Sequence, residues 1–194
     1  MAKKHTRDII DFEYEERMSK QRAKRGFSDS DVLSIDYWFC NTISPMLKQL
    51  AKKTPGFFLL DEKGNIISFD KPLSTEENYM YLKRWLDMIQ HLVFLADEMN
   101  ENKCSMKNPY DKEWNRIERI FEKKYGFLGE KLQTEEDKKS DGIRMYTPID
   151  DPVNGKEYSK VWNSYRKCEK EIERYREKCK REFFKLFSKY FRYF

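Results

Sequence analysis

The chain has 194 residues, of which 39% are apolar and 38% are charged, so its core has to be built from amphipathic elements rather than wholly buried ones. A chain of this length buries a continuous core without disulfides or metals, and its seven Gly and six Pro are too few for an all-β sandwich. The net charge of +5 is too small to indicate nucleic-acid binding by itself.

The N-terminal part of the chain begins with a charged segment. Residues 1–25 place a few apolar side chains among dense charges, which predicts a short helix followed by a basic linker. Ser28 precedes Asp31 by three residues, as in a capping box, so the next helix should begin there. Its apolar residues recur every three or four positions and predict a buried stripe made of Val32, Ile35, Phe39, Ile43, Met46 and Leu50. Pro45 interrupts this pattern, which predicts a kink or two short helices meeting at Ser44–Pro45.

A small β-hairpin is predicted over residues 57–69. Two apolar, β-prone runs flank Lys63–Asn65, a tripeptide whose residues tolerate the positive φ angles of a tight turn. Two strands alone are only marginally stable, so the hairpin should pack on helices.

Two further helices have regular apolar patterns. Ser74 opens the first, whose apolar residues have the spacing of a core helix, and the second covers residues 111–125. Residues 28–125 are therefore predicted to form the helical core. A long polar loop over residues 126–155 should follow, because Gly and Pro recur along it.

The last element is one long amphipathic helix over residues 157–193. Its apolar side chains alternate steps of three and four without a break from Tyr158 to Tyr190, which gives a length of about 54 Å. Such a helix is longer than one small core can cover, so we expect a homo-oligomer. Residues 156–194 contain thirteen Lys and Arg against six Asp and Glu, and at +7 they are the basic part of the chain.

These elements together predict a mainly α fold in a single domain over residues 1–194. It would be a helical bundle with a small β-hairpin and one long C-terminal amphipathic helix. The first 25 residues lack the apolar run of a secretory signal, and no segment approaches the roughly 20 apolar residues that cross a bilayer. We therefore expect a cytoplasmic protein that does not engage a membrane.

Metal and enzyme chemistry have little support in the sequence. The four cysteines form no C-x-x-C pair and only two histidines could join them, so we expect thiols, no metal site and no cofactor. Serine-nucleophile, Walker-type and zinc-hydrolase motifs are absent, and we expect no enzyme. Asp29, Asp31 and Asp36 could bind magnesium, but acidic residues at the start of a helix more often complement its dipole.

Two short motifs stand near the ends of the chain, Arg25–Val32 with Ile35–Trp38, and Leu186–Phe191. They resemble a family of uncharacterised bacteriophage proteins. Arg25–Val32 (RGFSDSDV) with Ile35–Trp38 (IDYW) is similar to a G-[FW]-x-D-x-D-x-W-x-L-D-x-W block near the start of that family, although the first tryptophan is missing here. Leu186–Phe191 (LFSKYF) is similar to its L-F-x-K-Y-F end. The resemblance covers a small part of the chain and brings no established activity. It implies a viral accessory protein, located in the host cytoplasm.

The resemblance makes a phage-encoded accessory binding protein the leading hypothesis. It would inhibit host defence by binding a nucleotide signal or a host protein. For a nucleotide, rings would stack on the base and guanidinium groups would pair with phosphates. The residues predicted to do so are Arg25, Tyr37, Trp38, Arg84, Trp85, Arg144 and Tyr146.

Two alternatives remain open. The protein could be a nucleic-acid-binding accessory protein that uses the basic C-terminal helix, or a virion or scaffold component. Glutamates interleave with the cations of that helix, so many of its charges should pair along the helix. The sequence therefore allows nucleic acid as a partner but does not favour it.

Overall fold

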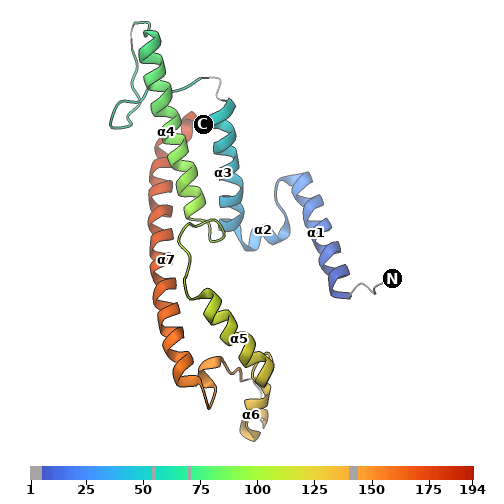
Figure 1. The fold of residues 1–194 in the computed structure, drawn as a ribbon. Helices are drawn as coiled ribbons and strands as arrows, with labels where there is room; N and C mark the ends of the chain where they lie inside the picture. The colour runs from blue at the N-terminus through green and yellow to red at the C-terminus, as the bar shows by residue number, and fades with distance from the viewer. Residues whose placement is uncertain (1–5, 54–55, 70, 140–143) are drawn as a thin grey trace. The chain divides into compact units, whose positions relative to one another are not determined.

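The fold is mainly α-helical, as the composition and periodicity predict, and it includes one long helix near the C-terminus (Figure 1). The chain divides into two compact units. Unit 1 comprises residues 1–104 and 176–194, and unit 2 comprises residues 105–175. This division describes contacts within the folded chain and does not test whether the two units fold and unfold together. The single domain over residues 1–194 therefore stays a prediction. The computed structural model describes residues 6–53, 56–69, 71–139 and 144–194.

Unit 1 begins with helix α1 (Thr6–Arg25), which includes the stretch predicted to be a basic linker. That prediction is wrong because basic side chains in the last turn of a helix complement its dipole and favour its continuation. Gly26 ends the helix with a φ of +82°, and its amide donates to the carbonyl oxygen of Arg22 at 2.9 Å. Residues 1–5 of the predicted segment lie outside the described residues.

Helix α2 (Asp29–Leu33) begins where the sequence predicts. Ser28 and Asp31 form the expected capping box, in which each side chain accepts a hydrogen bond from the backbone amide of the other. Arg22 of α1 donates two hydrogen bonds to the Asp31 carboxylate, at 2.9 and 2.7 Å. The Arg22 guanidinium therefore holds the pKa of Asp31 below its usual range, and the ion pair joins α1 to α2.

Of the two outcomes predicted at Ser44–Pro45, a kink or two short helices, the two short helices are not formed. The chain breaks at Ser34 instead, and helix α3 (Ile35–Lys53) runs through Pro45. The amide of Trp38 donates to the carbonyl oxygen of Ser34 at 3.0 Å, which starts a new helix at that point. Pro45 is exposed, so its ring faces solvent rather than a neighbouring element.

The buried face of α3 also differs from the predicted one. Helix α3 packs against helix α4 (Thr75–Glu98), and its buried residues are Cys40, Ser44 and Leu47. Burial of the predicted stripe is wrong at several positions, because periodicity identifies an apolar face without showing what covers it. The exposed fractions are 60% for Val32, 67% for Ile35 and 61% for Met46, while Phe39, Ile43 and Leu50 are half-buried.

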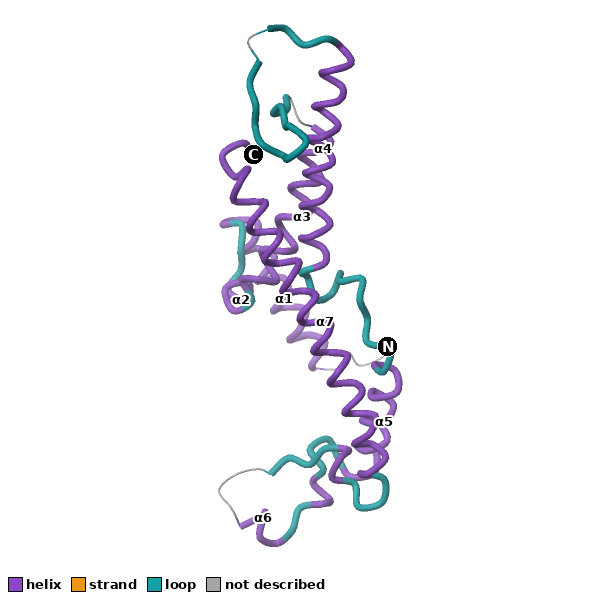
Figure 2. Tube along the Cα trace, turned by 90° about the vertical axis from the view of Figure 1, so that its left-hand side faces the viewer, coloured by secondary structure: helices purple, strands orange, loops and turns teal. Residues whose placement is uncertain are grey.

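The predicted β-hairpin over residues 57–69 is not formed, and Figure 2 shows no strand among the described residues. A single antiparallel bridge joins Leu60 to Ile66. The Asp61 carboxylate accepts a hydrogen bond from the amide of Asn65 at 2.7 Å and so closes the turn between them. Pairing stops there because two short strands are marginal alone, and the segment instead buries Leu60, which is 2% exposed.

The core of unit 1 is aromatic and lies where α3 and α4 meet the second half of helix α7 (Gly155–Tyr190), as Figure 1 shows. Trp85 of α4 is 1% exposed. The rings of Phe58, Tyr190 and Phe194 surround it, with centroids 5.5, 6.2 and 5.9 Å away. Residues from three distant parts of the sequence therefore share one core.

A polar link joins α3 to α4 inside this unit. Ser44 is fully buried, and its hydroxyl donates to the Asp97 carboxylate at 2.7 Å. Lys48 donates to the other oxygen of the same carboxylate, also at 2.7 Å. Burial alone would raise the pKa of Asp97, but the hydrogen bonds from Lys48 and Ser44 outweigh it and lower the pKa.

Unit 2 packs helix α5 (Asp111–Tyr125) on the first half of α7. The rings of Trp114 and Trp162 lie 4.6 Å apart between centroids. Asn108, which is 5% exposed, donates from its side chain to the Tyr165 carbonyl oxygen at 3.0 Å and to Glu169 at 2.8 Å. These contacts fix the start of α5 against α7.

The region predicted to be a loop over residues 126–155 contains three short helical turns. They are η1 (Glu130–Leu132), α6 (Glu135–Lys139) and η2 (Pro148–Asp150). Residues 140–143 of this region lie outside the described part of the chain.

Helix α7 confirms the predicted long helix and has 36 residues, followed by the short turn η3 (Phe191–Tyr193). No disulfide joins the four cysteines. Among the helices of the described residues, none combines the length and the apolar content needed to traverse a bilayer.

Candidate nucleic-acid interface

The candidate site lies on α5, whose sequence fixes which side of the helix faces the protein. Trp114, Ile117 and Phe121 recur at steps of three and four and are 6%, 1% and 2% exposed, so one side is fully committed to the core. Gly126 ends the helix with a φ of +94°. The opposite side of α5 has to face solvent.

Four cations form a single row on that solvent side. They follow one another at steps of four, three and four residues, which places them within a narrow arc of the helix opposite the buried residues. We call this set the basic row: Lys112, Arg116, Arg119 and Lys123. All four side chains are exposed.

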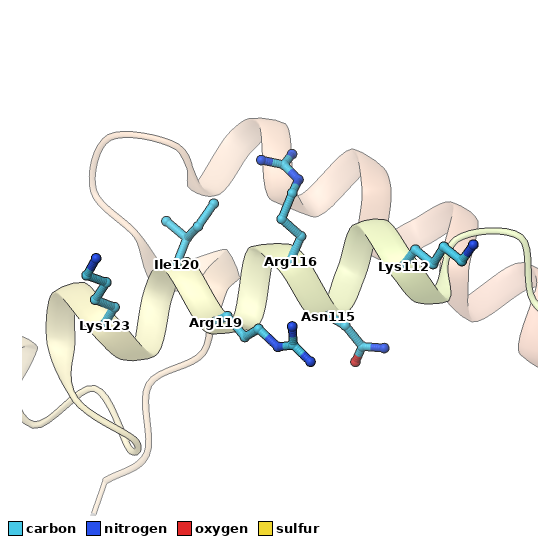
Figure 3. Close-up of a pocket in the computed structure, with 6 residues that line it drawn as sticks. All are labelled: Lys112, Asn115, Arg116, Arg119, Ile120 and Lys123. Carbon is cyan, nitrogen blue, oxygen red and sulfur yellow. The ribbon is translucent and has the colours of Figure 1, made fainter.

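The surface around the basic row forms a shallow depression of about 490 Å³ that is lined entirely by α5. Figure 3 shows Lys112 and Lys123 towards the two ends of the helix, with Arg116 and Arg119 between them. Asn115 and Ile120 complete the lining. No carboxylate lines this depression.

Several cations elsewhere in the chain have an ion-pair partner, unlike those of the basic row. Arg22, Arg84 and Arg144 each have a carboxylate within 4 Å, as do Lys48 and Lys124. Within the described part of the chain, no ion pair or hydrogen bond from the side chains of the basic row is found. Four like charges therefore stand side by side without internal compensation.

The row is suited to bind a chain of anions. Its ends are eleven residues apart, which is about 16 Å at the rise of an α-helix. Two guanidinium groups can each pair with a phosphate through two parallel hydrogen bonds, and two ammonium groups act as point charges. A polyanion that follows the helix would meet all four cations.

The residues predicted to bind a nucleotide lie in several places. Arg25 and Trp38 are brought together at the turn after α1, where Arg25 donates to the Phe27 carbonyl oxygen at 2.9 Å and Trp38 donates to that of Gly26 at 3.3 Å. Arg25 also pairs with Asp29. The guanidinium of Arg25 is therefore engaged by its own chain.

Tyr37 is exposed, and its hydroxyl accepts a hydrogen bond from the side chain of Asn102 at 3.1 Å. Arg84 donates to the Leu60 carbonyl oxygen at 3.1 Å and pairs with Glu62 at 3.4 Å. Each of these polar groups already has a protein partner.

Trp85 lies inside the aromatic core, so its ring has no free face for a base. Its Nε1 is the one buried side-chain nitrogen or oxygen in the described residues that has no hydrogen-bond partner. Among those residues, no hydrogen bond, ion pair or ring contact joins Arg84 or Trp85 to Arg25 or Trp38. Unit 1 therefore does not gather its five predicted residues into one pocket.

Arg144 and Tyr146 belong to unit 2 and both bind Asp137. The Tyr146 hydroxyl donates to this carboxylate at 2.6 Å and Arg144 donates to it at 3.2 Å. The hydrogen bond from Tyr146 holds the pKa of Asp137 well below its usual range, and in return the pKa of Tyr146 is raised. The pair organises the segment between α5 and α7.

The cations of α7, the site of the nucleic-acid alternative, are partly paired. Lys180 lies 3.1 Å from Glu177 on the same helix, and Arg176 lies 3.9 Å from Glu101. The first of these is the one ion pair within α7 among the described residues, so the structure does not show the expected pairing of many charges along this helix. No group of three or more His, Cys, Asp or Glu in the described residues could hold a metal ion.

The basic row was missed at the sequence level although a signal for it was present. The periodicity of residues 111–125 was used only to find the buried side of the helix. On the opposite side of the helix, residues at the same spacing are four cations with no acidic residue among them.

No protein-family model, curated protein or solved structure matches the chain. The resemblance of its two segments to a phage family therefore stays a prediction.

Proposed function

We propose that this protein binds the phosphate backbone of duplex DNA, without reading its sequence, through the basic row of α5. The observation that carries the proposal is the row itself, four exposed cations in line with no carboxylate partner among the described residues. Neutralisation of phosphates with release of their counterions supplies essentially all the free energy of sequence-independent DNA binding.

The composition of the row favours a duplex over a single strand. Proteins that bind single strands add aromatic platforms on which bases stack, and no ring lines the depression around the row. A helix is about 10–12 Å across and the major groove of B-DNA is about 12 Å wide, so α5 can lie along it with its cations near the phosphates, whereas the major groove of duplex RNA is deep and narrow. Duplex DNA therefore fits the row best.

Other anionic partners fit less well. An amphipathic helix that lies on a membrane inserts its apolar side, but the apolar side of α5 is buried against α7. Interfaces with proteins are centred on buried Trp, Tyr or Arg anchors in pockets, and Ile120 is the sole apolar residue of this depression. A surface made of charge alone suits a uniform polyanion.

The proposal changes the order of the earlier hypotheses. To bind a nucleotide signal, the protein has to bring aromatic rings and guanidinium groups together in one pocket. Here Arg84 and Arg144 already bind other groups of the protein, and Trp85 is buried in the core. A phage accessory role remains the setting that the sequence resemblance implies. DNA binding by such a protein would be non-enzymatic, as the absence of catalytic motifs leads us to expect.

Fluorescence anisotropy with a labelled duplex of arbitrary sequence tests the proposal over a range of salt concentrations. Four phosphate contacts give a slope of about −3.6 for log K against log [salt], so a fourfold rise in salt should weaken binding about 150-fold. Replacing all four cations of the basic row by Gln should abolish binding, since no described carboxylate needs them for folding.

The matched control removes four cations from α7 within the same unit. In this second variant Lys160, Lys167, Lys170 and Arg174 are replaced by Gln, and binding should persist. Loss of binding in the α7 variant with retention in the α5 variant would assign the contact to α7 and overturn the proposal. Equal affinity of the wild-type chain for a single strand of the same length would overturn the assignment to duplex DNA.

A further inference from the structure

An apolar stripe on α3 is only partly covered in unit 1: the ring of Phe39 packs on those of Phe183 and Phe184 of α7, while other side chains of the stripe are largely exposed. Its residues recur at steps of three and four along about 22 Å of helix. We call this set the α3 stripe: Ile35, Phe39, Ile43, Met46 and Leu50. Ile35 and Met46 are 67% and 61% exposed, whereas the core face of the same helix is turned towards α4. Part of the strongest apolar pattern of this helix is thus left open to solvent.

Two apolar depressions lie at the two ends of the α3 stripe. The C-terminal one has a volume of about 650 Å³, and the last turns of the chain line it together with α3. The N-terminal one has a volume of about 330 Å³. Two apolar depressions on the same helix, with exposed Ile35 and Met46 beside them, mark an interaction site rather than ordinary scatter.

The charges at the two ends of the stripe are opposite. Lys53 lines the C-terminal depression, and Asp36 is exposed in the first turn of α3, whereas Asp31, which lines the N-terminal depression, is already paired with Arg22. Neither Lys53 nor Asp36 has an ion-pair partner among the described residues. The face therefore runs from an acidic end through an apolar centre to a basic end.

We infer that the α3 stripe binds the α3 stripe of a second copy of this chain, in the antiparallel direction. A face of this kind is complementary to itself when reversed, as a two-fold symmetric interface requires. Ile43 and Met46 then lie at the centre, Phe39 lies level with Leu50 of the second copy, and the acidic end of each helix meets the basic end of the other. A parallel pair would place like charges together.

The inference goes beyond DNA binding and does not depend on it, because α3 and α5 belong to different units. A dimer would carry two basic rows, which would raise the affinity for a long duplex without any new contact.

Sedimentation equilibrium of the full chain, without DNA, tests the inference. The wild-type chain should be a dimer. Met46→Lys should raise the dimer dissociation constant by about thirtyfold or more, as expected for a residue at the centre of an interface. Met145→Lys is the matched control, since Met145 is 66% exposed and lies in unit 2, and it should leave the dimer intact.

A charge exchange tests the direction of pairing and the identity of the partner. Lys53→Glu and Asp36→Lys should each weaken the dimer, and the double variant should restore most of the loss, because reversal of both ends returns opposite charges to each contact. Circular dichroism confirms that each variant keeps its helices. A wild-type chain that is monomeric at about 100 μM, a dimer insensitive to Met46→Lys, or a double variant without recovery would each overturn the inference.

Discussion

Lys112 lies in the first turn of α5, where a cation opposes the helix dipole. Its nearest charged neighbour one turn along the helix is Arg116, another cation of the basic row, and no described carboxylate pairs with it. A side chain that destabilises its own helix is expected where it binds a partner molecule. We therefore predict that Lys112→Gln makes the protein more stable and a weaker DNA binder.

The expected gain in stability follows from two contributions. Removing a cation from the N-terminal turn contributes about 0.3–1 kcal/mol, and removing one like-charge pair four residues apart contributes about 0.2–0.5 kcal/mol. The sum is about 0.5–1.5 kcal/mol, which corresponds to a rise in Tm of about 1–6 °C for a chain of this size. Scanning calorimetry at low salt measures it, and anisotropy should show the salt slope of DNA binding smaller by about 0.9.

Lys167→Gln on α7 provides the control. Lys167 has the cation Lys170 three residues on and the carboxylate Glu171 four residues on, in the interior of a long helix, so its neutralisation should leave Tm nearly unchanged. The gain for Lys112→Gln should shrink at 1 M salt, where the Debye length is about 3 Å. A variant that is no more stable than the wild type at low salt would refute the reasoning, and so would a gain that salt does not reduce.

Two further predictions concern the core of unit 1. Asp97→Asn should lower the free energy of unfolding by about 1–3 kcal/mol, because it weakens the hydrogen bonds from Ser44 and Lys48. The lowered pKa of Asp97 means that its contribution is present above the ordinary Asp value of about 3.9 and is lost as the pH falls through the folded-state pKa, so urea titrations should show the difference between variant and wild type fading only at acidic pH. Trp85→Ala should lower the free energy of unfolding by about 3–5 kcal/mol, and Tyr37→Ala, at a 47% exposed ring, should change it far less in the same titration. Similar losses for the two aromatic variants would contradict the assignment of Trp85 to the core.

Local signals in the sequence were sufficient for several elements. The capping boxes at Ser28 and Ser74 place two helix starts correctly, and an unbroken alternation of steps places α7. These signals depend on hydrogen bonds and spacing within a few residues. Local physics decides them, and no knowledge of the tertiary contacts is needed.

Signals that depend on distant parts of the chain were misread. The apolar stripe on α3 has the periodicity of a core face, but the buried residues of this helix are Cys40, Ser44 and Leu47. Ser44 can be buried because its hydroxyl donates a hydrogen bond to Asp97 of α4. A single sequence does not show that pairing. Likewise, the segment around Leu60 has strand propensity, but its side chains found a better environment against the helices than across a hairpin.

For the candidate site, the positions of the cations can be predicted from the sequence, but their pairing cannot. Spacing alone reveals the four cations of the basic row. That those cations have no ion-pair partner among the described residues, while Arg84 and Arg144 have one, becomes visible only when carboxylates and carbonyls from distant residues are placed.

The division of the chain into units has a consequence for its synthesis. Unit 2 is one continuous stretch of residues 105–175, whereas unit 1 needs residues 176–194 to complete a core that begins within the first 104. On a ribosome, the ring of Trp85 therefore emerges long before Tyr190 and Phe194 arrive to cover it. The order of folding is thus reversed relative to the usual N-to-C progression of domains, with the middle of the chain able to fold first. Until translation reaches residue 194, the exposed aromatic half-core is a surface for chaperones to shield.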